Sequence, residues 1–123
     1  MTECETMTEI DELEGEELAA AVALKQGWHL FTDIGGRQCW ASGDEAGWHK
    51  SYYRPDEQIS LAWELDGEGW LWSQDTNSEE IEVTVEADGV WYTAKATYKD
   101  FHTKAQAYAT ARCRAFLKAK AAQ

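Results

Sequence analysis

A β-hairpin between residues 81 and 96 is the most strongly specified element of this sequence. Apolar and polar residues alternate from Ile81 to Glu86, and the pair Asp88-Gly89 is typical of a tight type I′ turn. Closing the chain at that turn predicts two sets of cross-strand pairs, one on each face. They are Val85–Tyr92, Val83–Ala94 and Ile81–Ala96 on one face, and Glu86–Trp91, Thr84–Thr93 and Glu82–Lys95 on the other. Because both faces agree in a single register, the chain is expected to contain an antiparallel sheet.

Helices and short strands are predicted on both sides of this hairpin. Helices are expected at about residues 10–26, ended by Gly27, at 55–65, started by Pro55, and from Thr103, where Thr103 and Gln106 fit a capping box. The last helix should bury Ala105, Ala109, Cys113, Phe116 and Leu117 and leave Lys104, Arg114 and Lys118 on the surface. Strands are expected at residues 28–31 and 70–72, and loops at 43–54 and 73–79. A two-residue turn at Gly35-Gly36 would place Thr32 opposite Cys39 and Phe31 opposite Trp40.

The element order α-β-β-α-β-β-β-α predicts an α+β fold. We expect an antiparallel sheet of about five strands with helices packed on it as a three-layer sandwich. Residues 1–12 are expected to form an acidic, partly flexible N-terminus, and residues 13–121 a single domain. The N-terminus has no secretory signal, and no apolar run is long enough to span a membrane, so a cytoplasmic protein is expected.

Seven tryptophans in 123 residues are an unusual number for a small acidic protein. Each ring can bury roughly 150–250 Å² of surface. The rings must therefore build a core, a binding face or both. They are Trp28, Trp40, Trp48, Trp63, Trp70, Trp72 and Trp91.

Charge is unevenly distributed along the chain, which carries a formal net charge of −12. The first 17 residues hold eight acids and no base, whereas residues 95–123 hold seven bases and one acid. Such a protein should repel nucleic acid and attract a basic partner.

The sequence contains no recognised catalytic or metal-binding motif. Cys4, Cys39 and Cys113 are far apart and make no disulfide framework or metal-ligand spacing with the histidines. Asp44-Glu45 and His49 could form an acid–base pair, but a solvated loop is the better interpretation. We therefore expect a protein that is not an enzyme and uses no cofactor or metal.

Four short stretches of the sequence form a recognisable set. They are Leu24-Lys25-Gln26-Gly27-Trp28, Cys39-Trp40-Ala41-Ser42-Gly43, Tyr53-Arg54-Pro55-Asp56 leading into Ala62-Trp63-Glu64, and Ala111-Arg112-Cys113-Arg114-Ala115. Together they resemble the phage ABA sandwich domain family, small proteins encoded in bacteriophage and prophage genomes. The resemblance covers most of residues 13–119 and implies a phage origin and a three-layer fold, without established catalytic residues. Family members typically carry Ser-Thr after the turn tyrosine, where this chain has Arg54-Pro55 and so lacks the hydroxyl cap.

These observations favour a phage-encoded binding protein that acts in the infected bacterial host. The first hypothesis is that it counters a host defence system by occupying a basic protein surface. The residues expected to bind the partner are Glu12, Glu16, Glu17, Trp48, Tyr52, Tyr53 and Trp91.

Two alternatives remain open at this point. One is an aromatic pocket that sequesters a nucleotide-derived defence signal, with its phosphate held by Arg37, Arg54, Lys95 or Arg112. The other is a phage accessory protein whose outer tryptophans form a homodimer, because aromatic residues are enriched in interface centres. Self-association into a dimer is expected under any of these hypotheses.

Overall fold

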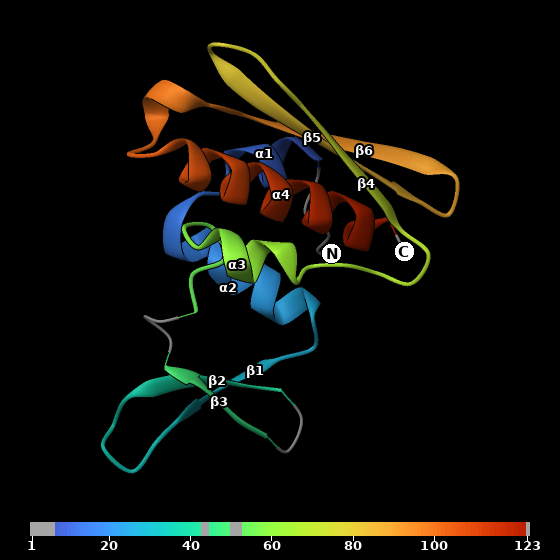
Figure 1. Cartoon of the computed structure of the whole chain (residues 1–123). Helices are drawn as coiled ribbons and strands as arrows, with labels where there is room; N and C mark the ends of the chain where they lie inside the picture. The colour runs from blue at the N-terminus through green and yellow to red at the C-terminus, as the bar shows by residue number, and fades with distance from the viewer. Residues whose placement is uncertain (1–6, 43–44, 50–52, 123) are drawn as a thin grey trace.

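The computed structural model describes residues 7–42, 45–49 and 53–122, and its helices lie between two small antiparallel sheets (Figure 1). The helices are α1 (Met7–Glu12), α2 (Gly15–Lys25), α3 (Ile59–Trp63) and α4 (Lys104–Ala121), with a short 3₁₀ turn at Tyr98–Asp100. The first sheet consists of β1 (His29–Thr32), β2 (Gln38–Ser42) and β3 (Glu45–His49), in that order. The second sheet consists of β4 (Leu71–Thr76), β5 (Glu80–Ala87) and β6 (Val90–Thr97), also in that order.

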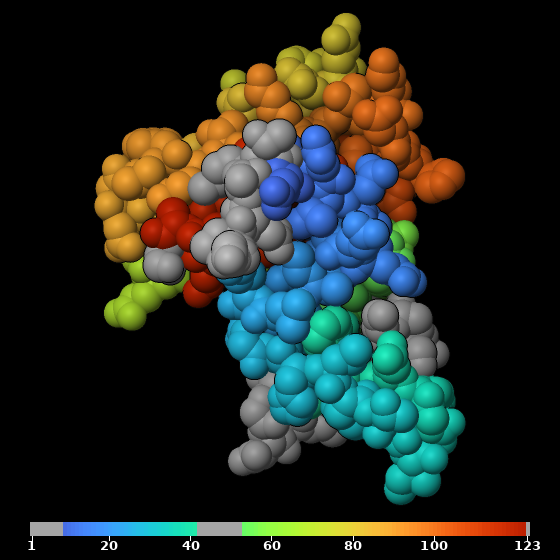
Figure 2. Space-filling model, turned by 180° about the vertical axis from the view of Figure 1, so that it is seen from behind, coloured from blue at the N-terminus to red at the C-terminus, as the bar shows by residue number. Residues whose placement is uncertain are grey.

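The α+β class predicted from the sequence is confirmed, but the expected single sheet of about five strands is two sheets of three. The difference arises in segments expected to be loops. Residues 45–49 form β3, and β4 extends through residues 73–76. Figure 2, seen from behind, shows α1 and α2 in blue between the second sheet above and the first sheet below.

The second sheet has the predicted hairpin register at every position. Val85 pairs with Tyr92, Val83 with Ala94 and Ile81 with Ala96. The turn residues Asp88 and Gly89 both have positive φ, 55° and 80°, as a type I′ turn requires. The alternation therefore turns one apolar face of β5 towards α4.

The first sheet differs from the prediction by one residue of register. Phe31 lies opposite Cys39 rather than Trp40, because the turn has three residues, not two. The carbonyl of Asp33 accepts the amide of Gly36, the Asp33 amide donates to the carbonyl of Arg37, and Gly36 adopts a φ of 83°. This is a three-residue hairpin turn with a glycine bulge, and the Asp33 carboxylate stabilises it by accepting the Arg37 amide at 2.9 Å.

The first predicted helix is divided into α1 and α2 by residues 13 and 14. Residues 7–12, expected to belong to a flexible terminus, form α1 and bury Ile10 in the main core. Gly27 ends α2 as predicted: its amide and that of Trp28 bond back to the carbonyls of Leu24 and Ala23, which is a Schellman motif. The helix expected at 55–65 is only α3, because Pro55–Glu57 form a turn.

Helix α4 is the central element of the main core. It packs against the second sheet on one side and against α2 and α3 on the other (Figure 1). Thr103 caps it as predicted, accepting the amide of Gln106 at 3.1 Å. Of the three basic residues expected on its surface, Lys104 is exposed and Arg114 is partly buried, but Lys118 is buried. Ala105, expected in the core, is exposed. The alanines of α4 let its neighbours approach closely enough to enclose Lys118.

The tryptophans with described side chains divide among core, boundary and surface. Trp40 and Trp70 are buried, Trp28 and Trp72 are partly buried, and Trp63 and Trp91 are exposed. No helix in the described residues is long and apolar enough to cross a membrane.

Candidate functional site

The second sheet has one face on α4 and another turned away from the helices (Figure 1). Side chains alternate along each strand, so the residues between the buried Ile81, Val83 and Val85 point outward. The register extends this assignment to β4 and β6. We define the outer face as the side chains of Leu71, Ser73, Asp75, Glu80, Glu82, Thr84, Glu86, Trp91, Thr93 and Lys95.

One row of the outer face carries two large apolar side chains that are exposed to solvent. Leu71 lies opposite Glu86, and Glu86 lies opposite Trp91, so the three residues cross the sheet side by side. Leu71 is 67% exposed and Trp91 is 65% exposed. Exposed tryptophan is enriched at binding hot spots, so this row is a candidate contact surface.

The remainder of the outer face is hydroxylic and acidic. The hydroxyls of Thr84 and Thr93 lie 3.0 Å apart and form a hydrogen bond. Lys95 is the one base of the defined face, and its Nζ lies 3.6 Å from Glu82 and 4.0 Å from Glu80. With Asp75 and Glu86 also present, acids outnumber bases, so the face complements a basic surface.

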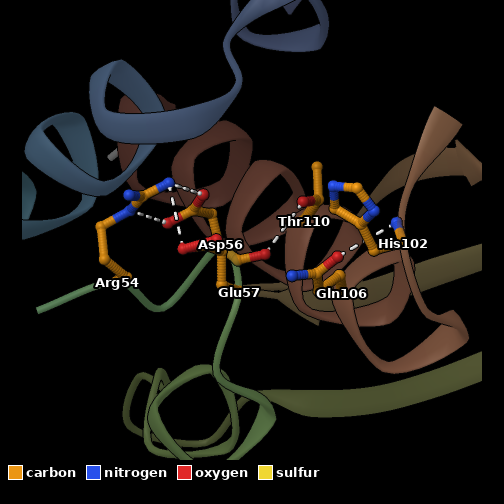
Figure 3. A network of polar contacts seen from close by, with 6 residues as sticks. All are labelled: Arg54, Asp56, Glu57, His102, Gln106 and Thr110. Carbon is orange, nitrogen blue, oxygen red and sulfur yellow. Dashed lines mark hydrogen bonds and ion pairs between the residues drawn. The ribbon is translucent and has the colours of Figure 1, made fainter.

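A second candidate is an open cleft of about 290 Å³ beside the N-terminus of α4. Figure 3 shows the polar network around it. Arg54 donates two hydrogen bonds to the carboxylate of Asp56, at 3.0 and 2.9 Å, and lies 3.4 Å from Glu57. The hydroxyl of Thr110 donates to the carbonyl of Asp56 at 3.1 Å, and the Gln106 side chain accepts the amide of His102. The Thr110 bond fastens the 54–57 turn to α4, and the other bonds hold the turn and the start of the helix in place.

The charges of this cleft do not suit an anion. Its lining includes four carboxylates, those of Glu14, Asp56, Glu57 and Asp100, against the single guanidinium of Arg54. The hydrogen bond that Arg54 donates to Asp56 raises the pKa of Arg54, because the carboxylate stabilises the charged guanidinium. We therefore interpret the network as a structural clamp. No group of metal-ligating side chains occurs among the residues that the structure describes.

The acids expected to bind a partner are exposed, but they lie apart from the outer face. Glu12 is on α1, and Glu16 and Glu17 are on the first turn of α2, in the helical layer. Trp91 lies on the outer face of the second sheet. The predicted partner-binding set therefore divides between two surfaces.

Tyr53, expected to lie in an accessible loop, is 3% exposed. Its hydroxyl accepts a hydrogen bond from Gln26 at 2.7 Å, and its ring centre lies 4.5 Å from that of Trp28. Burial raises the pKa of Tyr53 to about 12. It is therefore a core residue. Trp48 lies in β3 opposite Trp40, and Tyr52 lies outside the described residues.

Arg112 is buried and cannot hold a phosphate without leaving its partners. Its guanidinium donates to the carbonyls of Ala62 at 2.8 Å and Leu65 at 3.0 Å. The same group lies 3.7 Å from the ring centre of Trp72 and 4.7 Å from that of Trp63. It joins α4 to the last turn of α3 and its following residues.

The other predicted anion ligands are not brought together. Arg37 lies at the turn between β1 and β2, where it pairs with Asp33 at 3.3 Å. Arg54 is held by Asp56, and Lys95 by the acids of the outer face. No shared anion site is formed by these cations in the described structure.

Leu71 was not among the residues expected to bind a partner. The signal was present in the predicted strand Trp70-Leu71-Trp72, because alternation separates Leu71 from the two rings that flank it. Only the pairing of β4 with β5 places Leu71 in the same row as Trp91. Strand 70–72 alone does not specify that register.

Comparisons with protein-family models, with curated proteins and with solved structures find no match for this chain.

Proposed function

We propose that this protein is a non-enzymatic binding protein whose outer face covers a basic surface of another protein. The observation that carries the proposal is the row formed by Leu71, Glu86 and Trp91, two exposed apolar side chains separated by a carboxylate. Burying the exposed part of one tryptophan is worth about 3 kcal/mol before the costs of association.

Charge supplies the second part of the argument. The acids of the outer face would pair with basic groups around an apolar contact, and the net charge of −12 would speed the encounter. Glu12, Glu16 and Glu17 would contribute to this long-range attraction from the helical layer. Binding should therefore weaken as salt rises.

The biological setting of the proposal rests on the phage-like motifs. We propose that the protein acts in the cytoplasm of an infected bacterium and that its target belongs to a host defence system. Nucleotide capture has less support, because Arg112 is buried and the other three cations lie on different elements. Titration with cyclic nucleotides and ADP-ribose, followed by tryptophan fluorescence, would still reveal such a pocket.

The first test captures proteins from a bacterial lysate at low and high salt. The wild type is compared with Trp91→Ser and with Leu24→Ser, a matched control because Leu24 is 60% exposed on α2. We expect basic proteins to be retained by the wild type and the control, and lost at least tenfold with Trp91→Ser. Equal retention by all three proteins would contradict the proposal.

Two further measurements separate the surfaces and the alternatives. Reversal of Glu82 and Glu86 to lysine should abolish capture, whereas reversal of Glu12, Glu16 and Glu17 should slow it without abolishing it. Light scattering tests the expected dimer. A dimer that dissociates in Trp91→Ser would assign the outer face to self-association instead.

A further inference from the structure

The two edges of the second sheet are treated differently. Along β6, the outward carbonyls are occupied by long side chains of α4. Lys118 donates to the carbonyl of Thr93 at 2.7 Å, and Arg114 donates to that of Lys95 at 3.3 Å. This edge is closed to another strand.

The β4 edge presents its backbone groups outward. In the hairpin the odd-numbered residues of β5 bond to β6, so its even-numbered residues bond to β4. Consequently the backbone N–H and C=O groups of Leu71, Ser73 and Asp75 point towards β5. The backbone N–H and C=O groups of Trp72, Gln74 and Thr76 point away from the sheet. The bond from the Asn77 amide to the Glu80 carbonyl continues the same alternation.

Nothing in the described part of the chain covers the outward groups of β4. No hydrogen bond from another described element reaches the backbone of Trp72, Gln74 or Thr76. Over its six residues the strand contains no proline, lysine or bulge, and its one charged side chain is Asp75. Its start is fixed, since the Trp72 indole donates to Asp66 at 2.9 Å.

We propose that β4 receives an extended segment of the partner protein, which adds a fourth, antiparallel strand to the second sheet. This inference rests on the proposed function and names how the partner is held. Every strand of the sheet is antiparallel to its neighbour, and main-chain bonds to Trp72, Gln74 and Thr76 would hold the segment.

Side chains of the outer face define what the segment carries. Asp75 lies directly opposite Glu82, so a lysine or arginine beside Asp75 would meet one carboxylate about 5 Å away and a second about 10 Å away. Leu71 offers an apolar contact four positions earlier on the same face. An antiparallel partner segment would therefore carry a basic residue, then three other residues, then an apolar residue.

Charge argues against a second copy of this chain as the occupant. Symmetric pairing of two β4 strands would bring two copies of Asp75 and Glu82 onto one continuous face. Each copy also carries a net charge of −12. A basic segment removes this repulsion, whereas a second copy doubles it.

The test uses a labelled peptide, acetyl-Thr-Lys-Thr-Val-Thr-Leu-Thr-amide, and fluorescence anisotropy with the full chain. The variant Gln74→Pro removes an outward N–H that the sheet itself does not use, and Gln74→Val is its matched control. We expect Gln74→Pro to weaken binding at least tenfold and Gln74→Val to leave it unchanged. A peptide with glutamate in place of lysine should also bind at least tenfold more weakly.

Two controls keep the result interpretable. If Gln74→Pro fails to fold, a peptide N-methylated at alternate residues tests the same main-chain bonds with the wild-type protein, and undiminished binding would overturn the proposal. Amide exchange should slow at Trp72, Gln74 and Thr76 when the unmodified peptide binds. Protection confined to other residues would also overturn it.

The strand-addition proposal and the proposed function can be contradicted separately. If Gln74→Pro captures partners and peptide normally while Trp91→Ser does not, the strand-addition proposal falls and the proposed function stands. If both variants behave like the wild type, both proposals fall. A dimer that dissociates only in Gln74→Pro would show that the edge pairs with a second copy, and this would overturn the proposed occupant.

Discussion

The two sheets have the same number of strands and the same sequential strand order but differ in how they are supported. In the second sheet, Ile81, Val83 and Val85 are buried against α4 as part of the main core. In the first sheet, every residue of β1 is exposed, and a small cluster of Ala23, Trp40, Tyr53 and Leu61 provides the support. Two antiparallel sheets can therefore share one helical layer and depend on it to different degrees.

Alternation alone does not make a firmly held sheet. Strands β5 and β6 present a continuous apolar face to a long helix, so each residue pair along them adds buried area. The first sheet relies on large aromatic rings at few positions, with Leu30 and Phe31 partly in water. We expect it to open before the second sheet does.

The largest effect is expected from the helical layer that both sheets share. Arg112→Leu leaves the carbonyls of Ala62 and Leu65 without their charged donor and removes the contacts with two indole rings. We expect a loss of about 4 kcal/mol in the free energy of unfolding, measured by urea denaturation. Arg112→Lys keeps the charge but not the fork of donors, and should lose about half as much. A loss below 1 kcal/mol for Arg112→Leu would show that water replaces the guanidinium.

Native-state hydrogen exchange compares the sheets directly. The amides of Val83 and Val85 should exchange at least a hundredfold more slowly than those of Phe31 and Cys39, which corresponds to about 2.7 kcal/mol. The reason is the difference in buried support described above. Equal protection in both sheets would mean that they unfold as one unit and would remove the distinction.

Alkaline unfolding tests the small cluster beneath the first sheet. Burial raises the pKa of Tyr53 to about 12, against about 10 for a free phenol. The folded state thus holds this proton more tightly, so the associated stability is complete below pH 10 and is lost as the pH rises towards 12. Tyr53→Phe should remove about 1.3 kcal/mol of pH-dependent loss between pH 9 and pH 11, measured by urea denaturation at these two pH values. The same alkaline slope in both proteins would place the phenol in water.

The smallest effect is expected at the turn between β1 and β2. Gly36→Ala places a Cβ at a φ of 83° and should cost about 1 kcal/mol. Gly35→Ala is the matched control, because Gly35 lacks a positive φ, and its added methyl would lie 3.4 Å or more from its neighbours. Thermal unfolding of both variants is the measurement. A larger loss in Gly35→Ala than in Gly36→Ala would contradict the bulged turn.

The hairpin of β5 and β6 could be predicted residue by residue because two local signals agree. Its alternation fixes the faces, and Asp88-Gly89 fixes the turn. At the first hairpin, the pair Gly35-Gly36 is compatible with more than one type of turn. The hydrogen bond to the Asp33 side chain and the positive φ of Gly36 select the three-residue turn, which shifts the strand register by one residue.

The candidate site was only partly predictable. Trp91 could be assigned to the polar face of its hairpin, and it is exposed. Arg112 and Tyr53 were misassigned because their burial depends on α3 and α4 packing closely, which is a tertiary effect. The alanine-rich composition of α4 was the available signal, since a helix with small residues on every side can be enclosed on every side.

The central position of α4 also bears on how the protein is made. Every other helix and strand described here precedes α4 in the chain, yet Arg114 on α4 bonds to the carbonyl of Leu13, 101 positions earlier. A nascent chain would therefore leave the ribosome with the second sheet translated and the helix that supports it still missing. The apolar side of β5 can be buried only after α4 has been made, and chaperones would meet it before α4 covers it.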